Sequence, residues 1–142
     1  MLDAIVARLK SDVPALGSRI EAAAELTTML QKRGLPQRST TFVVPLGLQA
    51  RPAVDATGLH VQEFTETVGV LLVARVNDQT GADAMANIRP LIMAVINAIA
   101  GWDAGTGYGV FELRRGNLVG IRDGALIYMT EFSINDQLRV SQ

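Results

Sequence analysis

The chain of 142 residues contains no cysteine, a single histidine and few aromatic residues. Without cysteine it can form no disulfide, no thiolate zinc site and no cysteine nucleophile. With His60 as its only histidine, it lacks the motifs that bind zinc through two histidines. Aromatic residues make up 5% of the sequence, although 49% of its residues are hydrophobic. The core is therefore predicted to be aliphatic, as suits helices packed on a β-sheet.

The charge is also close to balanced, because 13 basic residues stand against 14 acidic ones, with a net charge of −1. A protein that grips DNA through its phosphates needs a basic surface, so we expect no specific nucleic-acid binding. Residues 1–10 lack the apolar run of a signal peptide. Charged and amide side chains interrupt the longest apolar stretch, residues 82–100, so we expect no membrane span and synthesis in the cytoplasm. The length suits a single domain over residues 1–142.

Three segments have the apolar spacing of amphipathic helices. The first covers residues 2–13 and ends where a proline follows. The second, near residues 19–33, begins with a capping box and ends at a glycine. The third covers residues 82–100, and Pro90 inside it is expected to kink or split the helix.

Five segments are predicted to be strands, at residues 40–44, 61–76, 110–115, 118–122 and 125–134. The strand at 61–76 becomes apolar on both faces near Leu71 and Val73. This places it in the centre of a sheet, or brings its second face against another subunit. Two-residue turns at Gly116-Asn117 and Asp123-Gly124 are predicted to join the last three strands. We therefore expect an α+β fold, with a mostly antiparallel sheet of about four to five strands and two main helices on one face.

Two segments are predicted to be irregular. Residues 45–60 contain prolines and glycines with little periodicity, and a connection of that length is often functional or mobile. Residues 136–142 are predicted to be a flexible tail.

The sequence contains no strong motif for catalysis or for ligand binding. His60 is interpreted as an ordinary surface residue. The glycines between Gly105 and Gly109 follow a helix and precede a strand, which is the reverse of the dinucleotide-binding arrangement. We therefore expect no catalytic residue, no metal site and no cofactor. Trp102 is predicted to anchor the end of the long helix on the sheet, whereas an exposed Trp102 would indicate a binding hot spot.

Glu63 and Glu66 are three residues apart on one strand, so they lie on opposite faces. Glu66 shares its face with apolar residues. The simpler interpretation is that this half of the strand projects beyond the core, and the alternative is an ion pair between subunits with Arg75 or Arg51. The candidate subunit interface comprises Arg51, Asp55, Glu63, Glu66, Leu71, Val73 and Arg75.

Several short motifs follow one another in a distinctive order. They are Arg19-Ile20-Glu21-Ala22-Ala23, Phe42-Val43-Val44-Pro45-Leu46, Gln62-Glu63-Phe64, Gly81-Ala82-Asp83-Ala84, Ile88-Arg89-Pro90-Leu91, Ile99-Ala100-Gly101-Trp102 and Tyr128-Met129-Thr130-Glu131-Phe132. In their order and spacing, over residues 2–135, they make the chain resemble the tail terminator proteins of long-tailed bacteriophages and prophages.

The resemblance implies a non-enzymatic protein that forms a closed ring, commonly a hexamer, on the last ring of the tail tube. Such a ring stops tube polymerisation and offers a surface for joining the head. The implied partners are further copies of the chain, the tail-tube protein and a head–tail connector protein. The implied location is the virion tail, assembled in the cytoplasm of the host bacterium, and DNA would pass through the ring. The resemblance assigns no catalytic or binding residues to this chain.

Two other functions are compatible with the sequence. One is a head-completion or head–tail connector protein of similar size. The other is a small-molecule-binding module or minor enzyme, with a pocket where residues 45–60 meet Gly105–Gly109.

Overall fold

The computed structural model of the chain describes residues 1–23, 39–56, 58–76, 82–105 and 109–141. Among them the helical elements are α1 (Leu2–Asp12), the short 3-10 turn η1 (Pro14–Leu16) and α3 (Ala82–Ile99). The strands are β1 (Ile20–Ala22), β2 (Thr40–Ala50), β3 (Val54–Ala56), β4 (Leu59–Arg75), β5 (Glu112–Arg122) and β6 (Ala125–Ser141). The predicted α+β class is confirmed.

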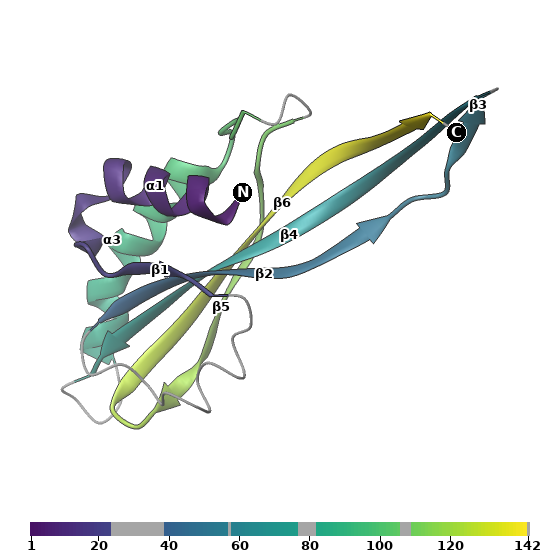
Figure 1. Cartoon of the computed structure of the whole chain (residues 1–142). Coiled ribbons are helices and arrows are strands. Elements are labelled where there is room, and N and C mark those ends of the chain that lie inside the picture. The colour runs from purple at the N-terminus through teal and green to yellow at the C-terminus, as the bar shows by residue number, and fades with distance from the viewer. Residues whose placement is uncertain (24–38, 57, 77–81, 106–108, 142) are drawn as a thin grey trace.

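The strands form one sheet in the order β1-β2-β4-β6-β5, with β3 also paired to β4. β1 runs parallel to β2, and every other pair is antiparallel. α1 contacts β1 and β2, whereas α3 contacts β4 and β6, so both helices cover one side of the sheet (Figure 1). We call this side the helix face and the other side the opposite face.

The helix face holds the main core. Ile5 and Leu9 of α1 pack with Val95 and Ile99 of α3 over the sheet. The sheet residues beneath them include Val43, Val68, Val70 and Phe132, all 4% exposed or less. Each large aliphatic side chain removed from water in this way contributes about 1.5–3 kcal/mol. The apolar spacing in the sequence therefore predicted the buried side of both helices.

The helix α3 runs from Ala82 to Ile99 without interruption, so Pro90 does not split it, and the expected kink at Pro90 stays a prediction. Pro90 is exposed, on the side of the helix that faces away from the sheet. By length and composition alone, α3 is the one described helix apolar enough to cross a membrane. Its apolar stripe, which includes Ile88 and Ile92, instead packs on the sheet as that of a core helix does.

Trp102 anchors the end of α3, as predicted. Its ring stacks on Phe111, with the ring centroids 5.9 Å apart, and the Arg8 guanidinium lies 5.2 Å from the centre of the indole. Two backbone hydrogen bonds join the same segments, from Gly101 N–H to the Phe111 carbonyl and from Phe111 N–H to the Trp102 carbonyl. The end of α3 is therefore tied to α1 and to the segment before β5.

The opposite face is also apolar where the central strands pass through the body. Its buried side chains are Phe42, Val44, Leu71, Val73, Ala125, Ile127 and Met129, and Ala23 packs against them. The two-sided apolar segment of the sequence therefore lies in the middle of the sheet, between β2 and β6.

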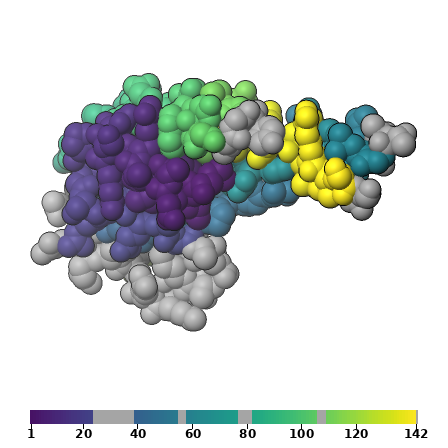
Figure 2. All heavy atoms as spheres, turned by 45° about the horizontal axis from the view of Figure 1, so that its top comes forward, coloured from purple at the N-terminus to yellow at the C-terminus, as the bar shows by residue number. Residues whose placement is uncertain are grey.

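Past the helices, the sheet continues as a narrow arm (Figures 1 and 2). The arm comprises residues 47–56, 58–67 and 134–141, from β2, β3, β4 and β6. A register shift between Pro45 and Gly47 marks the point where β2 enters the arm. Gly47 has φ +138, a conformation that L side chains rarely adopt.

The arm corrects two expectations. Residues 45–60 are not a long loop, because β2 extends to Ala50 and β4 begins at Leu59. Residues 136–141 are not a flexible tail, because they pair with β4 as far as the Ser141–Leu59 pair. Both segments are partly exposed on both faces, so neither has the alternation of buried and exposed residues that would reveal a strand.

Two further expectations fail locally. The helix predicted near 19–33 is wrong at its start, where residues 20–22 form β1 beside β2, and residues 24–33 lie outside the described residues. The turn predicted at Gly116-Asn117 is also absent. β5 runs through both residues, with irregular register at two points. The Asp123-Gly124 turn is confirmed, with φ of 52° and 74°.

Gly124→Ala tests the importance of this turn. A side chain at φ +74 costs about 1–2 kcal/mol, so the variant should lose about 1 kcal/mol of unfolding free energy. Gly120→Ala in β5 is the matched control, because a Cβ there meets nothing within 4 Å. Urea denaturation measures both, and an equal loss in the two variants would contradict the turn assignment.

Candidate interaction surface

The arm is a sheet that no described helix covers, and its helix face carries a diagonal apolar stripe. Leu48 on β2, Phe64 on β4 and Leu138 on β6 are diagonal neighbours, since Leu48 pairs with Glu66 and Phe64 pairs with Asp136. Leu48 is 61% exposed and Leu138 is 43% exposed. We call Leu48, Phe64 and Leu138 the arm stripe.

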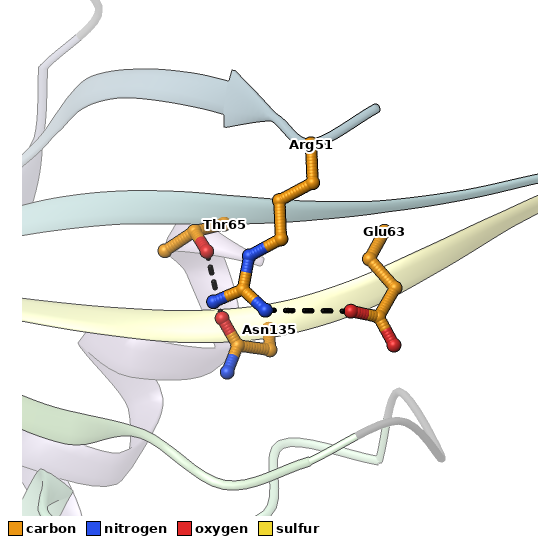
Figure 3. Close-up of polar contacts among 4 residues, drawn as sticks. All are labelled: Arg51, Glu63, Thr65 and Asn135. Carbon is orange, nitrogen blue, oxygen red and sulfur yellow. Dashed lines mark hydrogen bonds and ion pairs between the residues drawn. The ribbon is translucent and has the colours of Figure 1, made fainter. Parts of the chain in front are cut away.

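The opposite face of the arm carries several polar contacts between its strands (Figure 3). Arg51 Nη1 lies 3.5 Å from Glu63 Oε2, and the Thr65 hydroxyl donates to Asn135 Oδ1 at 2.7 Å. The backbone N–H of Arg51 also donates to the Glu63 carbonyl. These contacts join β4 to the end of β2 on one side and to β6 on the other.

A cleft of about 260 Å³ lies on this face, lined by Gln49, Ala50, Arg51, Thr65, Thr67 and Arg114. Its ionisable side chains are two arginines. Gly105 and Gly109 are not among the lining residues, so this is not the pocket that the small-molecule hypothesis places there. Among the described residues, no group of three His, Asp or Glu side chains is arranged to hold a metal ion.

The structure brings some of the predicted interface residues together and separates others. Arg51 and Glu63 form an ion pair within the chain, whereas Arg75 donates to the Asp123 carbonyl at 2.9 Å. Glu66 lies on the helix face of the arm, and its carboxylate forms no hydrogen bond or ion pair with a described residue. Asp55 lies in β3, where it pairs with His60.

Leu71 and Val73 are buried inside the chain, at 0% and 2% exposed. They contact the apolar cluster on the opposite face, and they present no surface to another copy in this structure. Of the two interpretations of the two-sided apolar segment, the structure favours the central strand.

An exposed apolar surface on β5 was missed by the sequence analysis. Leu113, Leu118 and Ile121 are 44%, 46% and 43% exposed, and they share the helix face with Phe132, Tyr128 and Leu126 of β6. β5 is the outermost strand of the sheet, so its apolar residues have a strand on one side only. The sequence showed these residues as strand-forming, but it gave no sign that β5 lies at the edge.

Leu71→Ala distinguishes a core position from an interface position. Removing a fully buried leucine side chain should lower the free energy of unfolding by about 3 kcal/mol. Leu48→Ala, at an exposed position of the arm, should change the stability of the isolated chain by less than about 0.5 kcal/mol. Urea denaturation at low protein concentration measures both, and a stable Leu71→Ala variant would return Leu71 to the interface.

Comparison with known proteins agrees with the resemblance seen in the sequence. A family model described as phage tail terminator protein matches residues 2–142. Among solved structures, a chain from the virion of a native gene transfer agent particle is similar in fold, with a TM-score of 0.53 and 16% identity. The alignment covers 100% of this chain and 95% of that one. The comparison with curated proteins gives no match. Because the family model spans nearly the whole sequence, the chain belongs to the phage tail terminator protein family.

Proposed function

We propose that the protein forms a closed homo-oligomeric ring, a hexamer, which caps the tail tube, stops its polymerisation and provides the surface on which the head is joined. Membership of the family establishes the coarser role of a structural phage tail protein. The observation that carries the finer proposal is the arm, which extends beyond the chain's own core (Figure 2).

A sheet arm with both faces partly in water gains little stability from its own packing. Leu48 and Leu138 on the arm are 61% and 43% exposed. Burial against other subunits removes such apolar surface from water. A ring arises when each subunit uses two different patches and the rotation between neighbours closes. The arm and the exposed side of β5 are two unlike patches on one chain, which supports this geometry.

A net charge of −1 suits a ring through which DNA passes. Arg51 is paired with Glu63, and Arg115 is paired with Glu131. Arginines neutralised in this way bind phosphate less strongly than free ones, so DNA is less strongly retained. In this proposal the partners are the tail-tube protein on one side and the head–tail connector protein on the other. The ring is assembled in the bacterial cytoplasm, has no catalytic role and needs no cofactor.

The ring is tested by light scattering of the purified chain, alone and with tail-tube protein. Six copies of a 15.2 kDa chain should give a particle of about 91 kDa, and addition of the ring should arrest growing tubes. A strict monomer that leaves tube length unchanged would contradict the proposal.

Electron microscopy of assembly mutants separates the terminator from the head–tail connector. A phage that lacks the terminator should produce overlong or unjoined tails. Normal tails beside unfinished heads would instead indicate a connector or head-completion role.

A further inference from the structure

The helix face of β5 is only partly covered in the described part of the chain. The main sheet contacts of α1 are with β1 and β2, and those of α3 are with β4 and β6. The exposed apolar residues of β5 on this face are Leu113, Leu118 and Ile121.

One flank of α3 borders this area. On the flank near α1, the carbonyl of Ala98 accepts a hydrogen bond from Arg8 at 3.1 Å. Arg89 lies on the flank of α3 directly opposite Ala98, and so on the side of β5. The exposed Arg89 forms no ion pair with a described residue. We call Leu113, Leu118, Ile121 and Arg89 the β5 surface.

The arm stripe is bordered by acidic residues, whose charge is opposite to that of Arg89. Glu66 and Asp136 are the neighbours of its three apolar residues on the same face. The Glu66 carboxylate contacts no described polar group, and the Asp136 carboxylate accepts a hydrogen bond from the N–H of Gln137 at 2.7 Å. Both side chains are only partly exposed, so an unpaired charge there is more costly than on an open surface.

We propose that the arm stripe of one copy packs on the β5 surface of the next copy, with Glu66 and Asp136 facing Arg89. This inference rests on the proposed ring and assigns its interface. Two arm stripes would place like charges together, and so would two β5 surfaces. The charges therefore favour contact between unlike patches, which is the arrangement that propagates around a ring.

A charge exchange tests the pairing in the full-length chain. Glu66→Arg and Arg89→Glu should each raise the dissociation constant of the ring about tenfold or more, because each places like charges in contact. The triple variant Glu66→Arg/Asp136→Arg/Arg89→Glu should restore assembly to within about threefold of the unchanged chain, since both acidic contacts of Arg89 are re-formed with reversed polarity. Analytical ultracentrifugation measures the assembly, and circular dichroism shows that each variant is folded. If Glu66→Arg does not fold, Asp136→Arg replaces it.

Two controls keep the outcomes distinct. Glu112→Arg makes the same charge change at an exposed position on the opposite face of β5 and should leave assembly unchanged. Leu48→Ser on the stripe should weaken the ring, whereas Val54→Ser on the other face should not. A ring that survives both single charge changes, or that the triple variant fails to restore, overturns this interface and leaves the proposed function standing. A chain that stays monomeric at every concentration, with or without tail-tube protein, overturns both. If the chain assembles only when tail-tube protein is present, and the charge changes affect only that complex, then the arm stripe binds the tail tube. This result would overturn the contact between copies.

Discussion

The structure depends on the antiparallel pairing of β4 with β6, which continues without a register shift from Leu59–Ser141 to Arg75–Ala125. In one half of this ladder both faces are buried, and the apolar side chains there hold the helices and the remaining strands. In the other half the same hydrogen bonds continue, but little packs on either face. The arm is therefore an extension of the core strands, and its direction is set by the most stable part of the sheet.

This continuity affects how the arm can work in an assembly. A flexible segment that folds only on binding loses conformational entropy at that moment, which reduces its affinity. An arm already held by strand pairing loses less, so more of the energy of burying its apolar residues is available for association. The hydrogen bond from Thr65 to Asn135 and the ion pair of Arg51 with Glu63 support the arm on its opposite face. The apolar stripe on its other face is thereby presented in a defined geometry.

The two classes of exposed residues on the chain have different origins. Leu71 and Val73 were candidate contact residues because the sequence is apolar on both faces there, and burial within the chain accounts for that property. The exposed apolar residues of β5 and of the arm result instead from the ends of the helical layer, which contacts mainly β1, β2, β4 and β6 in the body of the sheet. Candidate contacts in this protein are found where that layer stops. Glu66 fits this pattern, because it is an acidic residue on the apolar face just beyond the last covered positions.

Periodicity in the sequence determined the elements that are buried on one face and exposed on the other, since alternation of apolar and polar residues follows directly from burial on one face. α1 and the stripe of α3 are of this kind. The central part of β4 was predicted instead from its apolar run, and the Asp123-Gly124 turn from its residue types. The arm strands at residues 47–56 and 136–141 lack such alternation, because neither of their faces is fully buried and their pairing partners are distant in sequence. The edge position of β5 and the burial of Leu71 depend on the order of strands in the sheet. Strand order arises from contacts between distant segments, and so only the tertiary structure decided which apolar residues face the core and which remain available to another molecule.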